Sequence, residues 1–399
     1  MKNVVAILTI LVTIGCGSPS SMGGDDTPTD APVITDDSSV SDVMSDDSRV
    51  PDAMVCTANI MSDPGNCGAC GRSCLGASCS LGLCQAKRLD SGDITGIGDF
   101  TADALFLYYT GFTASGSNPH RIWRIVMGPA NGADYLTLLF HPIPLSQIAF
   151  DGADFYVALP NIYDQFDRGV VRKINKEPFA GMDLATYQKP TTTAVLQQNG
   201  FVYWATDADQ TNNGDIKRVS TAGGAITTIT VLAGNVAYLG ADASNLFWVN
   251  NEGGGGIQPA LHRAPIAGGA AVRIAFGIFD FLDMDANRIY AVKKNTGQLI
   301  SVPKTGGIET VIGTGMTAGG AIDDSYVYAA QGNKLVAVTK AGVDAGLIWE
   351  GAPQGTVACP TTMKITRTKV IGEYVYFLVV PTTCNNTTLF NAIYRVARL

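Results

Sequence analysis

The sequence has few of the residues that most often carry catalysis. Its 399 residues include only three histidines, which stand far apart in the chain at His120, His141 and His262. It contains no Gly-x-Ser-x-Gly nucleophile motif and no His-Glu-x-x-His metal motif. These absences exclude the hydrolases and zinc proteases that such motifs identify.

The sequence also has no excess of basic over acidic residues. The formal net charge is -8. Residues 17–54 hold nine aspartates and one arginine, a net of -8, and Lys2 adds +1, so residues 55–399 carry -1. No basic footprint therefore argues for a nucleic-acid partner. Residues 16–54 are also rich in Ser, Thr and Pro and contain no aromatic residue, so we expect an acidic disordered tether.

The N-terminus carries an apolar run that is too short to span a bilayer. The run from Val4 to Ile14 follows Lys2, whereas a membrane helix needs roughly 20 residues. This layout is typical of a secretory signal. Thr13-Ile14-Gly15-Cys16 resembles the lipobox of bacterial lipoproteins. The resemblance implies a signal peptide at 1–15 and a lipid anchor on Cys16. The next residue is Gly rather than the Asp that retains some lipoproteins in the inner membrane, which favours the outer membrane or the cell surface.

Six of the nine cysteines lie within residues 55–84. Turn formers such as Asp63-Pro64-Gly65-Asn66 separate them, with almost no core-sized apolar residue between. So small a segment cannot stabilise itself by burial alone, and an even cysteine cluster in an exported chain indicates disulfides. The alternative is zinc at Cys67, Cys70 and Cys74, although no histidine completes that site. We predict a disulfide module, with the pairing left open, from Cys56, Cys67, Cys70, Cys74, Cys79 and Cys84.

The run from Asp63 to Cys74 also carries a family resemblance. It resembles a cysteine-rich motif of the plant stigma-specific protein type, which is common in exported proteins of predatory soil bacteria such as myxobacteria. The resemblance covers residues 55–84 and implies no defined activity.

From residue 94 onward, a turn followed by an apolar–aromatic pair recurs seven times, at intervals of 38 to 50 residues. A second apolar signature follows each pair, as in Ile216-Lys217-Arg218-Val219. Short β-branched and aromatic runs with Gly-rich turns indicate strands, and four strands per repeat of about 45 residues are typical of propeller blades. We predict an all-β fold with a seven-bladed β-propeller at 85–399, and six or eight blades as alternatives. The pairs are Leu105-Phe106, Phe155-Tyr156, Val202-Tyr203, Leu246-Phe247, Ile289-Tyr290, Val327-Tyr328 and Val375-Tyr376.

The last repeat ends after its third predicted strand. The run from Gln85 to Asp90 precedes the first repeat and resembles the fourth strand of other repeats. We predict that it completes the last blade, because pairing the two ends removes exposed strand edges. Cys359 precedes the first strand of the last repeat and Cys384 follows its second. The ends of an antiparallel pair lie together, so we expect these two thiols to form a disulfide.

Five loops between the second and third predicted strands are long, and in a closed ring these five are neighbours. They are residues 110–120, 159–169, 205–215, 250–260 and 381–391. Long loops on a rigid scaffold usually carry binding groups, so we expect a ligand site at this rim and the pore mouth. Trp204 and Trp248 also fit packing between blades. The candidate ligand contacts are Tyr109, Phe112, Tyr163, Phe166, Trp204 and Trp248.

One of these loops is rich in the oxygen ligands that calcium prefers. Asp207, Asp209 and Asp215 lie within nine residues. The loop lacks the twelfth-position glutamate of an EF-hand, where Arg218 stands instead. We expect no cofactor, with calcium as the alternative that this loop leaves open.

The pattern favours a non-catalytic binding or scaffold module. We expect a monomer, held on a membrane by its lipid anchor, that binds a protein, glycan or envelope ligand. The alternative is a propeller lyase or hydrolase with an active site at the rim. The repeat length is similar to that of the seven-bladed lyases that open streptogramin antibiotics, which use magnesium, but no residue here matches their catalytic arrangement.

Overall fold

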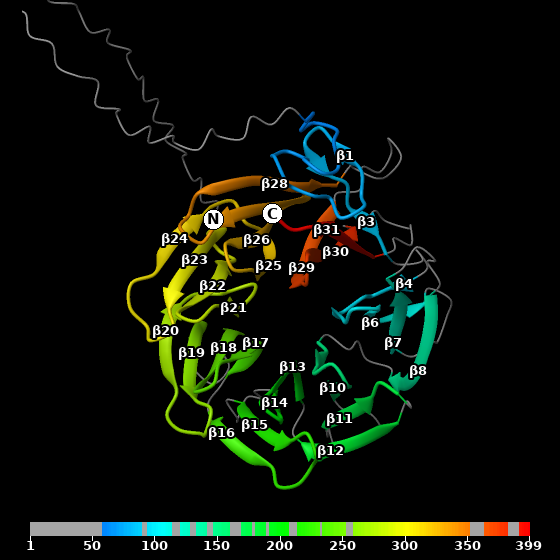
Figure 1. Cartoon of the computed structure of the whole chain (residues 1–399). Coiled ribbons are helices and arrows are strands. Elements are labelled where there is room, and N and C mark those ends of the chain that lie inside the picture. Colours follow the sequence, from blue (N-terminus) through cyan, green and yellow to red (C-terminus); the bar gives the residue numbers. More distant parts are fainter. Residues whose placement is uncertain are drawn as a thin grey trace, which may run out of the picture. The chain divides into compact units, whose positions relative to one another are not determined.

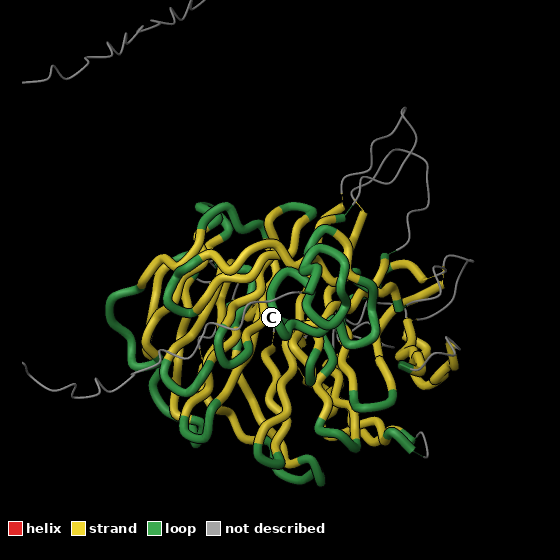
Figure 2. The backbone as a smooth tube through the Cα atoms, turned by 45° about the horizontal axis from the view of Figure 1, so that its top comes forward, coloured by secondary structure: helices red, strands yellow, loops and turns green. Residues whose placement is uncertain are grey.

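The computed structural model describes residues 58–89, 94–113, 120–127, 133–141, 147–159, 169–177, 180–188, 191–206, 214–231, 234–252, 258–351, 363–381 and 391–399. Every regular element in these ranges is a β-strand (Figure 2). No helix in the described residues is long and apolar enough to cross a membrane.

Seven antiparallel sheets follow one another along the chain and form a ring, which makes the fold a seven-bladed β-propeller (Figure 1). Blade 1 contains β4 (Ile94–Thr95), β5 (Phe100–Ala102), β6 (Phe106–Thr113), β7 (His120–Val126) and β8 (Ala133–His141). Blade 2 contains β9 (Ala149–Phe150), β10 (Asp154–Leu159), β11 (Gly169–Asn175) and β12 (Gly181–Gln188). Blade 3 contains β13 (Thr191–Gln198), β14 (Phe201–Thr206), β15 (Asp215–Ser220) and β16 (Thr227–Val231).

The remaining four sheets repeat the same antiparallel order. Blade 4 contains β17 (Asn235–Ala241), β18 (Asn245–Glu252), β19 (Ala260–Pro265) and β20 (Val272–Phe276). Blade 5 contains β21 (Asp283–Met284), β22 (Arg288–Lys293), β23 (Gln298–Pro303) and β24 (Thr310–Gly313). Blade 6 contains β25 (Ala318–Ile322), β26 (Tyr326–Gln331), β27 (Lys334–Thr339) and β28 (Asp344–Glu350). Blade 7 contains β29 (Met363–Ile371), β30 (Tyr374–Pro381), β31 (Ala392–Ala397) and the early strand β3 (Lys87–Arg88).

The two ends of the propeller share one sheet. Lys87 pairs with Arg395 and Arg88 pairs with Tyr394 in an antiparallel register. The backbone N–H of Leu89 donates to the carbonyl oxygen of Ile393 at 2.9 Å. The prediction that residues 85–90 complete the last blade is therefore confirmed.

The recurring apolar–aromatic pair has a physical reason. Along a strand, neighbouring side chains point to opposite faces, and the second strand of each blade is buried on both faces by the adjacent blades. In blade 5, Ile289 packs against blade 4, whereas Tyr290 packs against blade 6. In blade 1 the equivalent pair is Leu107-Tyr108, two residues later than the sequence pattern indicated. Side chains alternate between the two faces of a strand, so Leu105-Phe106 and Leu107-Tyr108 both fit the apolar–aromatic pattern. Leu105, however, is exposed in the turn before β6.

An aspartate turn precedes the second strand in five blades. In each turn, one carboxylate oxygen accepts backbone N–H groups from the residues two and three positions later. In four of them the other oxygen accepts the hydroxyl of a tyrosine five positions later. A lysine of the following blade also pairs with Asp103, Asp242 and Asp285. The aspartate turns are those of Asp103, Asp151, Asp242, Asp285 and Asp323.

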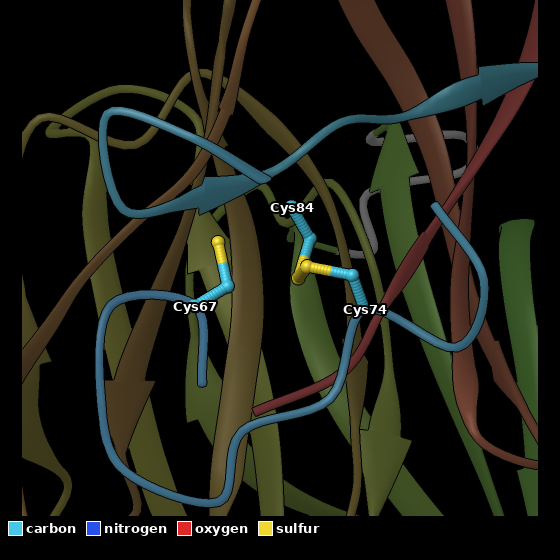
Figure 3. Close-up of side chains that lie close together, drawn as sticks. All are labelled: Cys67, Cys74 and Cys84. Atoms are coloured by element: carbon cyan, nitrogen blue, oxygen red, sulfur yellow. A yellow bond between two sulfur atoms is a disulfide. The ribbon is translucent and has the colours of Figure 1, made fainter. Parts of the chain in front are cut away.

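The cysteine-rich segment is held by disulfides, as predicted, and its described cysteines are not zinc thiolates. Cys67 pairs with Cys79, and Cys74 pairs with Cys84. Cys70 is also in a disulfide. A short hairpin of β1 (Cys79–Ser80) and β2 (Leu83–Cys84) ends the segment. The sulfurs of Cys67, Cys74 and Cys84 lie within 4.8 Å of one another (Figure 3).

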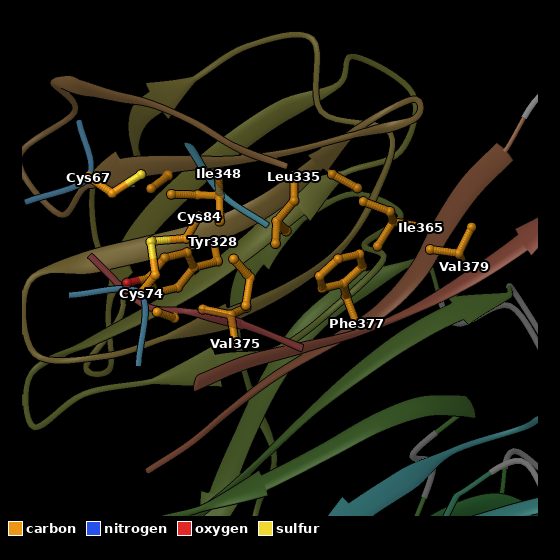
Figure 4. Close-up of a cluster of buried hydrophobic side chains, with 14 residues drawn as sticks. Cys67, Cys74, Cys84, Tyr328, Leu335, Ile348, Ile365, Val375, Phe377 and Val379 are labelled. Atoms are coloured by element: carbon orange, nitrogen blue, oxygen red, sulfur yellow. A yellow bond between two sulfur atoms is a disulfide. The ribbon is translucent and has the colours of Figure 1, made fainter. Parts of the chain in front are cut away.

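These sulfurs belong to the core of the ring. Cys67, Cys74 and Cys84 are at most 1% exposed and lie in one apolar cluster with residues of blades 6 and 7 (Figure 4). Tyr328 and Val375 come from those two blades and belong to the same cluster as Cys74 and Cys84. The cysteine-rich segment therefore covers the boundary between blades 6 and 7, directly before the strand that closes the ring.

Candidate functional site

Most of the predicted rim lies outside the described residues, and its binding role stays a prediction. Large parts of the five long loops, with Tyr163, Phe166, Asp207 and Asp209, are outside the described residues. The predicted anchor residue Cys16 and the predicted disulfide residues Cys56, Cys359 and Cys384 are outside them as well. The corresponding loops of blades 5 and 6 are short, at residues 294–297 and 332–333. In blade 7, Met363 pairs with Pro381, so the ends of the β29–β30 hairpin lie side by side. The disulfide predicted at these ends is untested.

Three of the predicted ligand contacts are buried. Tyr109, Trp204 and Trp248 are at most 1% exposed, and each lies in an apolar cluster between two blades. Trp248 stacks on His262, with ring centroids 5.3 Å apart. The backbone of Phe112 pairs with Thr95. These three buried aromatic side chains hold the blades together in this structure.

The calcium prediction rests on a loop of which only the end is described. The backbone N–H of Asp215 donates to Oγ1 of Thr206 at 2.8 Å. This contact involves the backbone of Asp215 alone, so calcium binding stays a prediction.

The structure contains a central cavity, where the inner strands of the blades meet. Its volume is about 330 Å³, and it is lined by residues on or next to the inner strands of blades 1, 4, 5, 6 and 7. Because every blade presents its innermost strand to the axis of the ring, residues far apart in sequence meet here. The charged or hydroxyl-bearing residues that line it are Thr101, Tyr238, Asp280, Asp283, Thr366, Arg367, Thr368 and Lys369.

The charges around this cavity are compensated within its wall. Lys369 forms an ion pair with Asp99, with Nζ 3.0 Å from Oδ1, and Asp99 is 4% exposed at its side chain. Lys294 forms an ion pair with Asp280 at 2.8 Å. Arg367 donates from Nε to the carbonyl oxygen of Gly98 at 2.8 Å. The contacts of Lys369 and Arg367 tie blade 7 to blade 1, whereas the Lys294–Asp280 pair lies within blade 5.

Two further groups are strongly affected by burial. Burial raises the pKa of Asp283, although the backbone N–H groups of Met284 and Ile322 donate to its carboxylate. Burial also raises the pKa of Tyr238 to about 12, and the carboxylate of Asp280 adds to the shift. Both groups therefore favour their uncharged form more than they would in water.

Thr368 is a buried residue of the cavity wall whose side-chain hydroxyl is unpaired within the part of the chain that the structure describes. It is 6% exposed, and its hydroxyl has no hydrogen-bond partner among the described residues. Buried hydroxyls are nearly always paired, so an unpaired one calls for an explanation. Sequence reasoning missed this site, since Asp280, Arg367 and Thr368 stand in no recognisable motif and only ring closure brings them together.

Comparisons with known proteins support the fold. No protein-family model and no curated protein matches the chain. A streptogramin B lyase structure is similar with a TM-score of 0.52 at 12% identity, over 78% of this chain and 97% of that one. A chain of a nidogen/laminin complex has a TM-score of 0.41 at 12% identity, over 60% and 93%. The computationally designed Ika8 protein has a TM-score of 0.41 at 12% identity, over 77% and 90%. The similarity to the lyase shows a shared propeller fold.

Proposed function

We propose that the chain is an exported, lipid-anchored β-propeller that binds a protein, glycan or envelope ligand without catalysing a reaction. A signal peptide at 1–15 directs export, acylated Cys16 anchors the protein in the outer membrane or at the cell surface, and residues 16–54 form the tether. The propeller then presents its ring face to the ligand.

One observation carries the binding role. The ionisable groups around the central cavity make ion pairs or hydrogen bonds with the wall itself, as Asp99 does with Lys369 and Asp280 with Lys294. A general acid or base instead needs a group that faces the substrate and has a pKa near the operating pH. Groups that are fixed and neutralised in this way suit recognition of a ligand better than proton transfer.

The anchor is tested by labelling cells with palmitate and fractionating their membranes. The chain should take up label and enter the outer-membrane fraction, and Cys16→Ser should abolish both. Protease added to intact cells should cut the protein if it faces the outside. A Cys16 that stays unlabelled in the mature protein would contradict the anchor.

The binding role is tested by sedimenting the Cys16→Ser chain with purified envelope fragments, before and after protease or glycosidase treatment of the fragments. We expect saturable co-sedimentation that one of the two treatments removes, which also separates a protein ligand from a glycan. Absence of saturable binding, or metal-dependent turnover of an envelope component, would contradict the proposal.

A further inference from the structure

The central cavity has the chemistry of a site for a small uncharged molecule. We propose that it binds one neutral, hydroxyl-rich ligand of the size of a single sugar ring. This inference rests on the proposed binding function and deepens it, because it names the ligand class and places the site on the axis of the ring.

The balance of charge argues for a neutral ligand. Asp99 and Asp280 are matched by Lys369 and Lys294. The carboxylate of Asp283 accepts the backbone N–H groups of Met284 and Ile322, and Arg367 donates to the carbonyl oxygen of Gly98, so the charged groups of the wall already have partners. A charged ligand would introduce an unpaired charge into a confined site, which is costly to desolvate. A neutral ligand avoids this cost.

The hydrogen-bonding groups argue for hydroxyls on the ligand. Each oxygen of Asp280 is in contact with one donor group, Lys294 at Oδ1 and the backbone N–H of Gly319 at Oδ2. A carboxylate oxygen has more than one lone pair, so both can accept a further hydrogen bond. The hydroxyl of Thr368 is buried and unpaired, and it can donate or accept. A ligand hydroxyl is the simplest partner for both residues.

The size and shape of the cavity fit a compact ligand. Its volume of about 330 Å³ is at the lower end of the range of small-molecule sites, roughly 300–1,000 Å³. Gly319 and Gly320 of blade 6 line one side without side chains, and Tyr238 of blade 4 contributes an aromatic ring and a phenol. A planar aromatic group beside fixed polar groups suits a ring-shaped polyhydroxyl molecule.

The test is a calorimetric titration of the full chain with four sugars of one ring size. Glucose and N-acetylglucosamine are neutral, whereas glucuronic acid is an anion and glucosamine a cation. We expect saturable binding of at least one neutral sugar, and at least about tenfold weaker binding of both charged ones. Equal or tighter binding of a charged sugar would overturn the inference, as would the absence of saturable binding of either neutral sugar.

Two variants place the binding in the cavity. Thr368→Val keeps the shape of the side chain and removes the hydroxyl, and Tyr238→Phe removes only the phenol oxygen. Each should weaken binding of the neutral sugar by about tenfold, and Thr368→Val should leave the melting temperature unchanged or raise it, because an unpaired buried hydroxyl is lost. Thr227→Val, an exposed position of β16, is the matched control and should bind as the wild type does.

Sugar binding that neither cavity variant weakens would overturn the inference. The outcome is separable from that of the proposed function. If the Cys16→Ser chain sediments with envelope fragments but binds no neutral sugar, the cavity site is wrong while the envelope-binding role stands.

Discussion

The aspartate turn of blade 5 should be a measurable source of stability. Asp285 accepts backbone N–H groups from Asn287 and Arg288, both at 2.9 Å, and the hydroxyl of Tyr290 at 2.8 Å. Nζ of Lys340 in blade 6 lies 3.1 Å from Oδ2 of Asp285. Removing the tyrosine hydroxyl deletes one hydrogen bond to a charged group, which contributes about 1.5–3 kcal/mol. Since the side chain of Asp285 is 27% exposed, we expect Tyr290→Phe to cost about 1.5 kcal/mol.

The larger change, Asp285→Ala, removes this hydrogen bond together with the three other contacts. The freed backbone groups lie in a turn that water can reach, and a partly exposed ion pair adds little, so the expected cost is about 3 kcal/mol. In the double variant the two costs should overlap by about 1.5 kcal/mol, because both single changes remove the same hydrogen bond. Asp242→Ala is the natural control, since its turn has Phe247 in place of the tyrosine and should cost about half as much.

Urea unfolding followed by tryptophan fluorescence measures these differences. Although burial opposes the shift, the hydrogen bonds hold the pKa of Asp285 well below its usual value. Because the pKa of Asp285 is lower in the folded than in the unfolded chain, its contacts contribute their full stability at pH values above the unfolded pKa of about 4. This contribution to stability should be lost as the pH falls below about 4 toward the folded-state pKa. Additive costs of the two single changes, or equal costs of Asp285→Ala and Asp242→Ala, would refute the reasoning.

Three further predictions concern other parts of the ring. Replacing Cys74 and Cys84 by Ala removes a disulfide with a sequence separation of 10, so the urea midpoint of the whole propeller should fall with a loss of about 3 kcal/mol; separate melting of the cysteine-rich segment alone would contradict this. Burial and a nearby arginine lower the pKa of His262 to about 4. Stability should therefore rise with pH between about 4 and 6.5, and His262→Gln should remove this slope if the cause is correct. Gly320→Ala places a methyl group 2.4 Å from the buried ring of Phe281, and a loss of about 1–3 kcal/mol is expected; an unchanged melting temperature would count against the packing described.

The sequence was sufficient to predict the blades because their second strands are buried on both faces. A pair such as Val327-Tyr328 faces two neighbouring blades at once, so its apolar character survives at every repeat. The closing strand at 85–90 was also predictable, because the last repeat lacked its fourth strand. The register failed only in blade 1, where Phe106 and Tyr108 occupy the same face of β6 and fit the pattern equally.

The cavity could not be predicted in the same way. Asp280 and Arg367 come from different blades, and their contacts depend on how the inner strands meet at the axis, which no local pattern records. The pairing of the cysteines could not be predicted from the sequence either. Six cysteines with similar spacing allow many pairings, and the core of blades 6 and 7 supplies the surface on which Cys74 and Cys84 meet.

Hydrogen exchange on the segment 85–89 tests the ring closure most directly. The backbone N–H of Leu89 donates to the carbonyl oxygen of Ile393, so it should exchange far more slowly than the amide of an unstructured peptide. Exchange of Leu89 at the rate of an unstructured peptide, while β23 stays protected, would contradict a propeller whose first strand completes its last blade.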